Sequence, residues 1–169
     1  MKTSPFRIDF RGSNGTLEYK TLYSVGADIP AQPYRPDPLL DESCWNEKER
    51  QWELWGNTRK LIPTGIVIVD VDYKSLNEWE MFGLKCIPSF HILPRSSLSK
   101  KGISASIGTI EVDYENFEMF VCLENNTNEK IVIPEGMRIG QLKCGVALRA
   151  PGIPVREAIR EGGFGSTGM

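Results

Sequence analysis

The sequence has few of the residues on which metal and disulfide chemistry depend. Its 169 residues include one histidine and four cysteines, and no two cysteines form a Cys-x-x-Cys pair. Three of the cysteines lie in apolar runs typical of strands, where a reduced thiol behaves as a small hydrophobic side chain. Neither a zinc site nor a disulfide framework is indicated. The single histidine, His91, lies in an alternating run just before Pro94 and is expected to be structural.

Long apolar segments and an excess of one charge are also missing. No stretch approaches the roughly 20 apolar residues of a membrane-spanning helix, and the first residues hold no apolar segment of a secretion signal. The net charge is −2, whereas nucleic-acid-binding surfaces normally carry a basic excess. We therefore expect a cytoplasmic protein that binds neither membranes nor nucleic acids.

Helical periodicity is scarce, and short β-branched and aromatic runs between turn residues take its place. Five runs are expected to be strands: 61–69, 86–93, 117–123, 130–133 and 139–148. Turn residues at 124–129 and 134–136 separate the last three. The sequence predicts an all-β domain over residues 1–159, a jelly-roll-like barrel with little helix, followed by a flexible arm at 160–169. Helix is expected after Pro94 and in part of the segment described next.

Residues 33–57 interrupt the strand pattern and are predicted to be an insertion. They contain three prolines and the tryptophans Trp45, Trp52 and Trp55. A short helix with one apolar side would bury these tryptophans on the barrel. Tryptophan is also frequent at protein interfaces, so a contact with a partner is the alternative. A second excursion, residues 70–83, is expected to pack beside this insertion.

The arm at 160–169 has a composition suited to a nucleotide. Four glycines flank Phe164, Ser166 and Thr167. Glycine lets backbone N–H groups approach phosphate oxygens, hydroxyl groups add donors, and an aromatic ring offers a stacking face. The alternative interpretation is a disordered tail.

Further segments carry groups suited to phosphate chemistry. A glycine turn precedes Asp28, an Arg-Ser-Ser triplet begins the predicted helix after Pro94, and Gln141 follows a second glycine turn. A helix start backed by positive charge suits anions. Alternate residues of an extended strand share one face, so Glu111 and Asp113 are expected to lie together. Each motif alone is common on protein surfaces, but their combination in one small β domain indicates a nucleotide site.

Taken in order, these segments resemble the five motifs of the trimeric dUTPase family over nearly the whole chain. The similar segments are 26–29, 94–99, 108–114, 136–142 and 162–168. The resemblance implies a jelly-roll-like subunit and a homotrimer with active sites at subunit interfaces. It also implies hydrolysis of dUTP to dUMP and pyrophosphate with Mg²⁺, which is held through substrate phosphates and water and has no direct protein ligand.

The same resemblance implies residue roles. Glu111 is the base that deprotonates water, and Asp28 and Asp113 are the other acids assigned to catalysis. Tyr114 stacks against the deoxyribose. The substrate-binding set is completed by Arg95, Ser96, Ser97, Gly108, Gln141, Arg160, Phe164, Gly165, Ser166 and Thr167.

Two positions depart from the family pattern. The family normally has aspartate at position 111, and its tail arginine lies five residues before the aromatic ring, where this chain has Ile159 and places Arg160 one residue nearer. Together with the insertion, these departures indicate a divergent member, such as one from a phage. Two alternatives to dUTP therefore stay open: hydrolysis of dCTP or a modified pyrimidine triphosphate, and nucleotide binding without catalysis. Deamination is disfavoured because residues 120–122 offer no acid.

Overall fold

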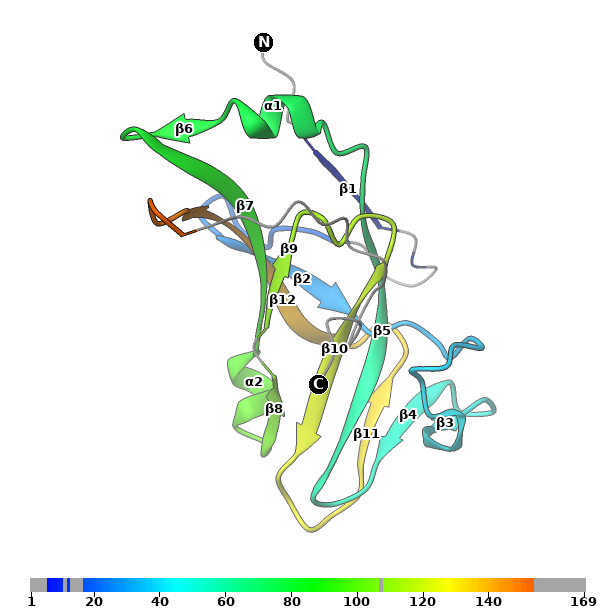
Figure 1. The fold of residues 1–169 in the computed structure, drawn as a ribbon. Coiled ribbons are helices and arrows are strands. Elements are labelled where there is room, and N and C mark those ends of the chain that lie inside the picture. Colours follow the sequence, from blue (N-terminus) through cyan, green and yellow to red (C-terminus); the bar gives the residue numbers. More distant parts are fainter. Residues whose placement is uncertain (1–5, 11, 13–16, 107, 154–169) are drawn as a thin grey trace.

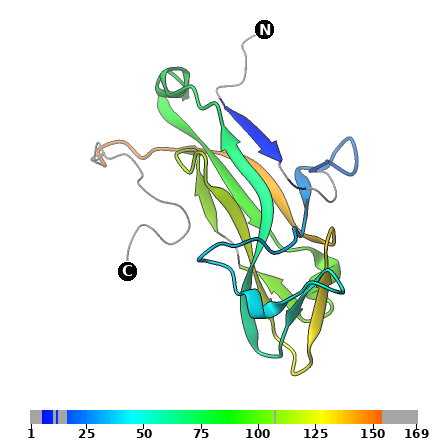
Figure 2. The same ribbon diagram turned by 90° about the vertical axis from the view of Figure 1, so that its right-hand side faces the viewer.

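The computed structural model describes residues 6–10, 12, 17–106 and 108–153. Two β-sheets enclose the hydrophobic core, and a small third sheet lies at one end of them (Figures 1 and 2). Helix in this part of the chain is limited to two short α-helices and one 3₁₀ turn. The predicted all-β, jelly-roll-like architecture with little helix is therefore confirmed. The same part of the chain holds no helix long and apolar enough to cross a membrane.

The first sheet has the strand order β1-β5-β10-β8, and the second has β2-β12-β7-β6 with β9 also paired to β7. The first sheet comprises β1 (Arg7–Phe10), β5 (Thr58–Val69), β10 (Glu118–Asn125) and β8 (Ile103–Ala105). The second comprises β2 (Gly26–Pro30), β12 (Arg138–Leu148), β7 (Leu84–Leu93), β6 (Glu80–Met81) and β9 (Thr109–Glu111). The third, β11-β4-β3, comprises β11 (Ile131–Pro134), β4 (Gln51–Leu54) and β3 (Trp45–Asn46). The helices are η1 (Glu42–Cys44), α1 (Tyr73–Asn77) and α2 (Ser96–Ser99).

Apolar side chains from both large sheets build the core. Ile62, Ile66 and Ile68 of β5 are fully buried, and Phe90 and Ile92 of β7 join the same cluster. Such β-branched and aromatic side chains pack well on a pleated surface. The five predicted strands are confirmed as β5, β7, β10, β11 and β12, and the predicted helix after Pro94 is confirmed as α2.

A β-bulge between Met119 and Phe120 shifts the register of β10 against β5. Thr64 and Gly65 of β5 are the extra residues at this bulge, and Gly65 has φ 71°, a backbone conformation open mainly to glycine. The carboxylate of Glu118 accepts the backbone N–H groups of Thr64 at 2.9 Å and Gly65 at 2.6 Å. These hydrogen bonds fix Glu118 against β5.

The insertion at 33–57 forms η1 and a β-hairpin, so the predicted amphipathic helix around the tryptophans is wrong. Burial along β4 alternates with the strand period, and Trp45 lies opposite Trp52 across the hairpin. β4 also pairs with β11, so its backbone N–H and C=O groups form hydrogen bonds between strands in place of the hydrogen bonds of a helix. Tertiary pairing of this kind overrides the local apolar spacing.

Two of the three tryptophans pack onto the barrel as expected. Trp52 is fully buried, and its indole N–H donates to the carbonyl of Gln32, just beyond β2, at 2.8 Å. The ring of Trp45 packs on Trp52 with centroids 5.3 Å apart. Trp55 remains 59% exposed, with the ammonium of Lys130 at 5.3 Å from its ring centroid. The insertion is therefore anchored on the end of the strand that carries the first motif.

Residues 70–83 form α1, β6 and the turn that leads into β7. Asp72 caps α1 by accepting the N–H of Ser75 at 3.1 Å. The N–H of Cys86 in β7 donates to the main-chain carbonyl of Trp79 at 3.0 Å, and this hydrogen bond holds the segment on β7. In Figure 1, α1 and β6 lie at the top while β3 and β4 lie at the lower right. The expectation that this excursion packs beside the insertion is wrong.

Candidate active site

Three residues of the second and fourth motifs surround the buried carboxylate of Asp28 at the end of the second sheet. Asp28 of β2 is 2% exposed. Arg138 donates to its Oδ2 at 3.0 Å, Gln141 donates to its Oδ1 at 3.2 Å, and the Nε of Arg95 lies 3.6 Å from Oδ1. Arg95 also donates to the main-chain carbonyl of Arg138 at 3.0 Å. We call Asp28, Arg95, Arg138 and Gln141 the Asp28 cluster.

The strands explain why these residues meet. Gln141 of β12 lies opposite Asp28 of β2 and opposite Leu93 of β7, and Arg95 follows Leu93 by two residues. Residues directly opposite each other on antiparallel strands present their side chains on the same face. The first, second and fourth motifs are therefore brought together within one chain.

The cluster sets the charge state of its carboxylate. Burial alone would raise the pKa of Asp28, but hydrogen bonds from Arg138 and Gln141 and the charge of Arg95 outweigh it and lower the pKa. One carboxylate faces two guanidinium groups, so the cluster carries net positive charge. The half-buried Arg95 and Arg138 are thus suited to bind anions such as phosphate.

We expect Asp28→Asn to destabilise the fold by roughly 1–3 kcal/mol near pH 7, because two guanidinium groups lose their buried counter-charge. A carboxyl whose pKa falls on folding stabilises the native state above its unfolded pKa of about 3.9, and that contribution disappears as the pH drops through the lower folded value. Urea unfolding of both proteins between pH 7 and pH 3 measures this. The gap between wild type and variant should begin to narrow below about pH 4 and shrink further toward pH 3, and a constant gap would contradict the assignment.

The two serines of the second motif lie beside the cluster at the surface. Ser96 and Ser97 are exposed in the first turn of α2, directly after Arg95. Their hydroxyl groups are accessible to a ligand that reaches Arg95. Gly108 is also exposed, and a Cβ atom added there would meet nothing within 4 Å.

The third motif turns sharply after Glu111. Glu111 is the last residue of β9 and lies opposite Ser89 of β7. The N–H of Tyr114 donates to the carbonyl of Glu111 at 3.0 Å and closes a turn through Val112 and Asp113. The expectation that Glu111 and Asp113 share one face of an extended strand is wrong because the strand ends at Glu111. Both side chains are exposed.

Within one chain, Glu111 at the end of the third motif lies apart from the Asp28 cluster, whereas the start of that motif at Thr109 is level with His91, only two residues from Leu93. Glu111 is level with Ser89 of β7, whereas Gln141 is level with Leu93, four residues further along that strand. At about 3.3 Å per residue this amounts to roughly 13 Å along β7, before the width of the intervening strands is added.

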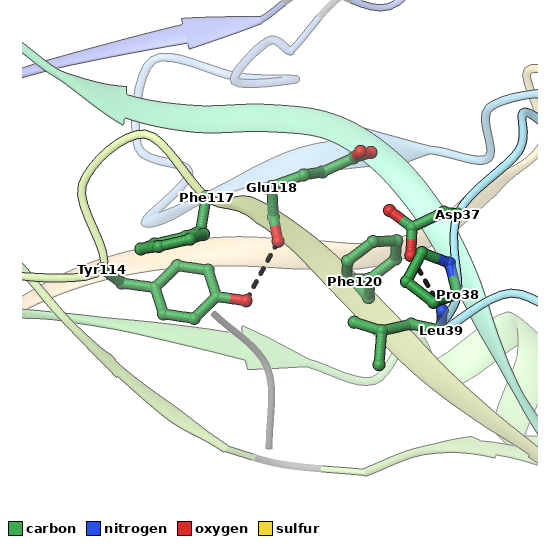
Figure 3. A pocket seen from close by; sticks show the side chains of 7 residues that line it. All are labelled: Asp37, Pro38, Leu39, Tyr114, Phe117, Glu118 and Phe120. Carbon is green, nitrogen blue, oxygen red and sulfur yellow. Dashed lines mark hydrogen bonds between the residues drawn. The ribbon is translucent and has the colours of Figure 1, made fainter. Parts of the chain in front are cut away.

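A hollow of about 210 Å³ lies beside Tyr114 (Figure 3). Aromatic side chains of the third-motif region line it together with residues of the insertion. The lining residues are Asp37, Pro38, Leu39, Tyr114, Phe117, Glu118 and Phe120. Tyr114 is buried, and its hydroxyl donates to the carbonyl of Glu118 at 3.2 Å. Glu118 in turn forms an ion pair with Arg35 of the insertion. The ring of Tyr114 is thus held in place by β10.

Arg138 is the site residue that sequence reasoning left out, although it lies inside the fourth motif. A single arginine after a turn has the sequence pattern of an ordinary surface charge. The structure shows that its guanidinium lies 3.0 Å from the buried carboxylate of Asp28. The predicted tail residues Arg160, Phe164, Gly165, Ser166 and Thr167 lie outside the described part of the chain.

Comparison with known proteins decides the family. A model of the dUTPase family matches residues 85–168. The deoxyuridine 5'-triphosphate nucleotidohydrolase of Brucella suis biovar 1 is 32% identical over 155 residues, covering 86% of this chain and 88% of that protein. The chain belongs to the dUTPase family. The enzyme of the same name from Cytophaga hutchinsonii is 30% identical to this dUTPase family member over 173 residues, covering 98% of this chain and 93% of that protein.

Solved dUTPase structures share the fold. The dUTPase of phage phi11 of S. aureus, whose structure includes a structural Mg(II) ion, aligns with a TM-score of 0.60 at 14% identity, over 90% of this chain and 97% of that one. The dUTPase of Streptococcus mutans aligns with a TM-score of 0.58 at 20% identity, over 87% of this chain and 98% of that one. The jelly-roll-like fold is thereby confirmed for this dUTPase family member.

Proposed function

We propose that this chain hydrolyses dUTP to dUMP and pyrophosphate. Membership of a family of deoxyuridine triphosphate hydrolases supports the reaction. The observation that carries it is the Asp28 cluster, in which two guanidinium groups share one buried carboxylate at 3.0 and 3.6 Å. Such a cluster presents fixed positive charge to an anion, as a triphosphate site requires.

In this proposal the Asp28 cluster binds the phosphates. Arg95 and Arg138 donate to phosphate oxygens, with the amide of Gln141 and the hydroxyl groups of Ser96 and Ser97 as further donors. Asp28 acts as a positioning residue because its buried oxygens are engaged by Arg95, Arg138 and Gln141. It fixes the direction of the guanidinium groups and does not itself contact the reacting atoms.

Glu111 is the proposed general base. It accepts a proton from a water molecule whose oxygen attacks the α-phosphorus, while the bond from that phosphorus to the α,β-bridging oxygen breaks and pyrophosphate leaves. An exposed carboxylate at the end of a strand can reach such a water. Asp113, exposed in the turn after β9, is the second acid of the proposed site and would hydrogen-bond to water or to the sugar.

Tyr114 is the proposed sugar platform. Its ring is packed at 5.6 Å from that of Phe117, and its hydroxyl is committed to β10. By the family resemblance, a sugar stacked on this fixed ring would have no space for a 2′-hydroxyl group. This supports discrimination against ribonucleotides. Main-chain groups of the segment between Gly102 and Gly108, most of which the structure describes as strand β8 and not as the expected turn, would read the base.

We infer that each active site is shared between subunits of a homotrimer. The separation of roughly 13 Å along β7 between the levels of Glu111 and Gln141 supports this arrangement. A second copy could bring its Glu111 next to the Asp28 cluster. The glycine-rich arm from 160 to 169, including Arg160, Phe164 and Thr167, would close over the bound nucleotide.

Mg²⁺ fits this site only through the substrate. Among the described residues, no three His, Cys, Asp or Glu side chains lie close enough together to hold a metal ion. The Asp28 carboxylate already accepts from Arg138 and Gln141. The donor set therefore suits an ion that arrives on the triphosphate and is held by phosphate oxygens and water, where it would offset the phosphate charge.

A pyrophosphate-release assay tests the proposed function. The panel contains dUTP, dCTP, dTTP, UTP and modified pyrimidine triphosphates, each with and without Mg²⁺. We expect turnover of dUTP that needs Mg²⁺, with UTP strongly disfavoured. Preference for dCTP or a modified pyrimidine would replace dUTP by the first alternative, and binding without release would establish the second.

A further inference from the structure

Arg50 of the insertion contacts Glu135, the residue just before the fourth motif. Arg50 lies in the turn between β3 and β4, and its Nε donates to Oε2 of Glu135. The side chain of Glu135 is only 7% exposed. The main chain repeats the contact, because the N–H of Glu135 donates to the carbonyl of Arg50 at 3.0 Å. Arg50 thus binds Glu135 with both its side chain and its backbone.

The backbone of Arg50 is adapted to this contact. Its φ is 49°, in the left-handed region that non-glycine residues seldom adopt. Glu135 depends on the pair, since its other oxygen, Oε1, is buried with no hydrogen-bond partner in the described part of the chain. A buried carboxylate that lost Arg50 would be left without a counter-charge, which favours opening of the turn that contains it.

That turn leads directly to the Asp28 cluster. It runs from Pro134 to Met137 and is closed by a hydrogen bond from the N–H of Met137 to the carbonyl of Pro134 at 3.0 Å. Two hydrogen bonds of 2.8 Å join it to Ala31 at the end of the first-motif strand. The next residue is Arg138, whose guanidinium donates to Asp28. The turn is therefore held between the first-motif strand on one side and Arg50 on the other.

We propose that Arg50 is a positioning residue for Arg138, so that the insertion braces the phosphate-binding end of the site. The inference rests on the proposed function of the Asp28 cluster as a phosphate site. Arg50 does not contact the ligand. It fixes the turn from which Arg138 projects, and its loss should weaken phosphate binding while leaving the nucleoside end of the site unchanged.

The test compares two ligands on the full chain. Arg50→Gly deletes the side chain and keeps the backbone conformation, because glycine adopts positive φ without strain. Arg59→Ala is the matched control, since Arg59 is an exposed arginine whose carboxylate partner, Glu124, is 3.9 Å away. Calorimetry measures binding of inorganic pyrophosphate, and NMR titration measures binding of deoxyuridine. We expect Arg50→Gly to weaken pyrophosphate roughly tenfold and deoxyuridine not at all, and Arg59→Ala to change neither.

Three outcomes would overturn the proposal in distinguishable ways. If the wild type binds pyrophosphate and hydrolyses dUTP, and Arg50→Gly binds pyrophosphate equally well, Arg50 has no positioning role and the proposed function stands. Equal weakening of both ligands indicates a general structural role. A wild type that neither binds pyrophosphate nor hydrolyses dUTP removes the proposed function as well. If Arg50→Gly loses its cooperative thermal transition, Arg50→Lys replaces it and should weaken pyrophosphate selectively by a smaller factor.

Discussion

Replacing Glu111 with glutamine is expected to abolish turnover and to leave nucleotide binding intact. The amide has nearly the same shape as the carboxylate but cannot accept the proton of the attacking water. Loss of one positioned base typically lowers a rate by ~10²–10⁴-fold. Pyrophosphate release gives kcat, and calorimetry with the non-hydrolysable α,β-imido dUTP gives the affinity. A variant that keeps most of its kcat would contradict this role and point to Asp113.

Glu111→Asp is the matched control for this experiment. It restores the residue that the family normally has at this position and shortens the side chain by one methylene group. A displacement of about a bond length can misplace a catalytic water. Substantial activity in Glu111→Asp would mean that the backbone of β9 still suits an aspartate, whereas a large loss would mean that the site has adapted to glutamate.

Removal of residues 162–169 is expected to lower kcat/KM strongly while the fold stays intact. Stacking of Phe164 on the base should contribute ~1–3 kcal/mol, and closure of the arm also excludes water from the reaction. Phe164→Ala should show part of the loss. Steady-state kinetics of both variants measures this, and thermal melting checks the fold. A truncated chain with wild-type kinetics would establish the alternative of a tail without function.

Limited proteolysis provides an independent view of the same arm. We expect protection of residues 160–168 when α,β-imido dUTP and Mg²⁺ are both present, and no protection with dUMP. Equal cleavage in every state would contradict closure over the triphosphate.

The strands could be predicted because their signal is local. Residues 61–69 and 86–93 are rich in β-branched and apolar side chains, and they form most of β5 and most of β7. Arg95, Ser96 and Ser97 could likewise be placed at a helix start from Pro94 and the triplet alone. Local chemistry of this kind does not depend on partners distant in the sequence.

The remaining features depend on partners that the sequence does not identify. Trp52 becomes a strand residue because β11, nearly 80 residues later, pairs with β4. Asp113 is a local exception, because the N–H of Tyr114 closes a tight turn onto Glu111 and takes Asp113 out of the extended strand. The pairing of Arg138 with Asp28 spans 110 residues. Long-range pairing of this kind overrides local propensity, so the motifs could be found from the sequence but their contacts could not.

We expect Glu111 of one subunit and the Asp28 cluster of another to form one active site, and subunit complementation distinguishes this arrangement from a site within a single subunit. Glu111→Gln and Arg95→Ala should each be inactive alone. In randomly mixed trimers, a shared site is intact when one neighbour supplies Glu111 and the next supplies Arg95, so about one quarter of the sites should regain activity. Co-refolding the two variants in equal amounts and measuring pyrophosphate release from dUTP gives that fraction. Recovery near one quarter of wild-type activity is the predicted result, and mixed trimers that remain inactive would contradict a shared site.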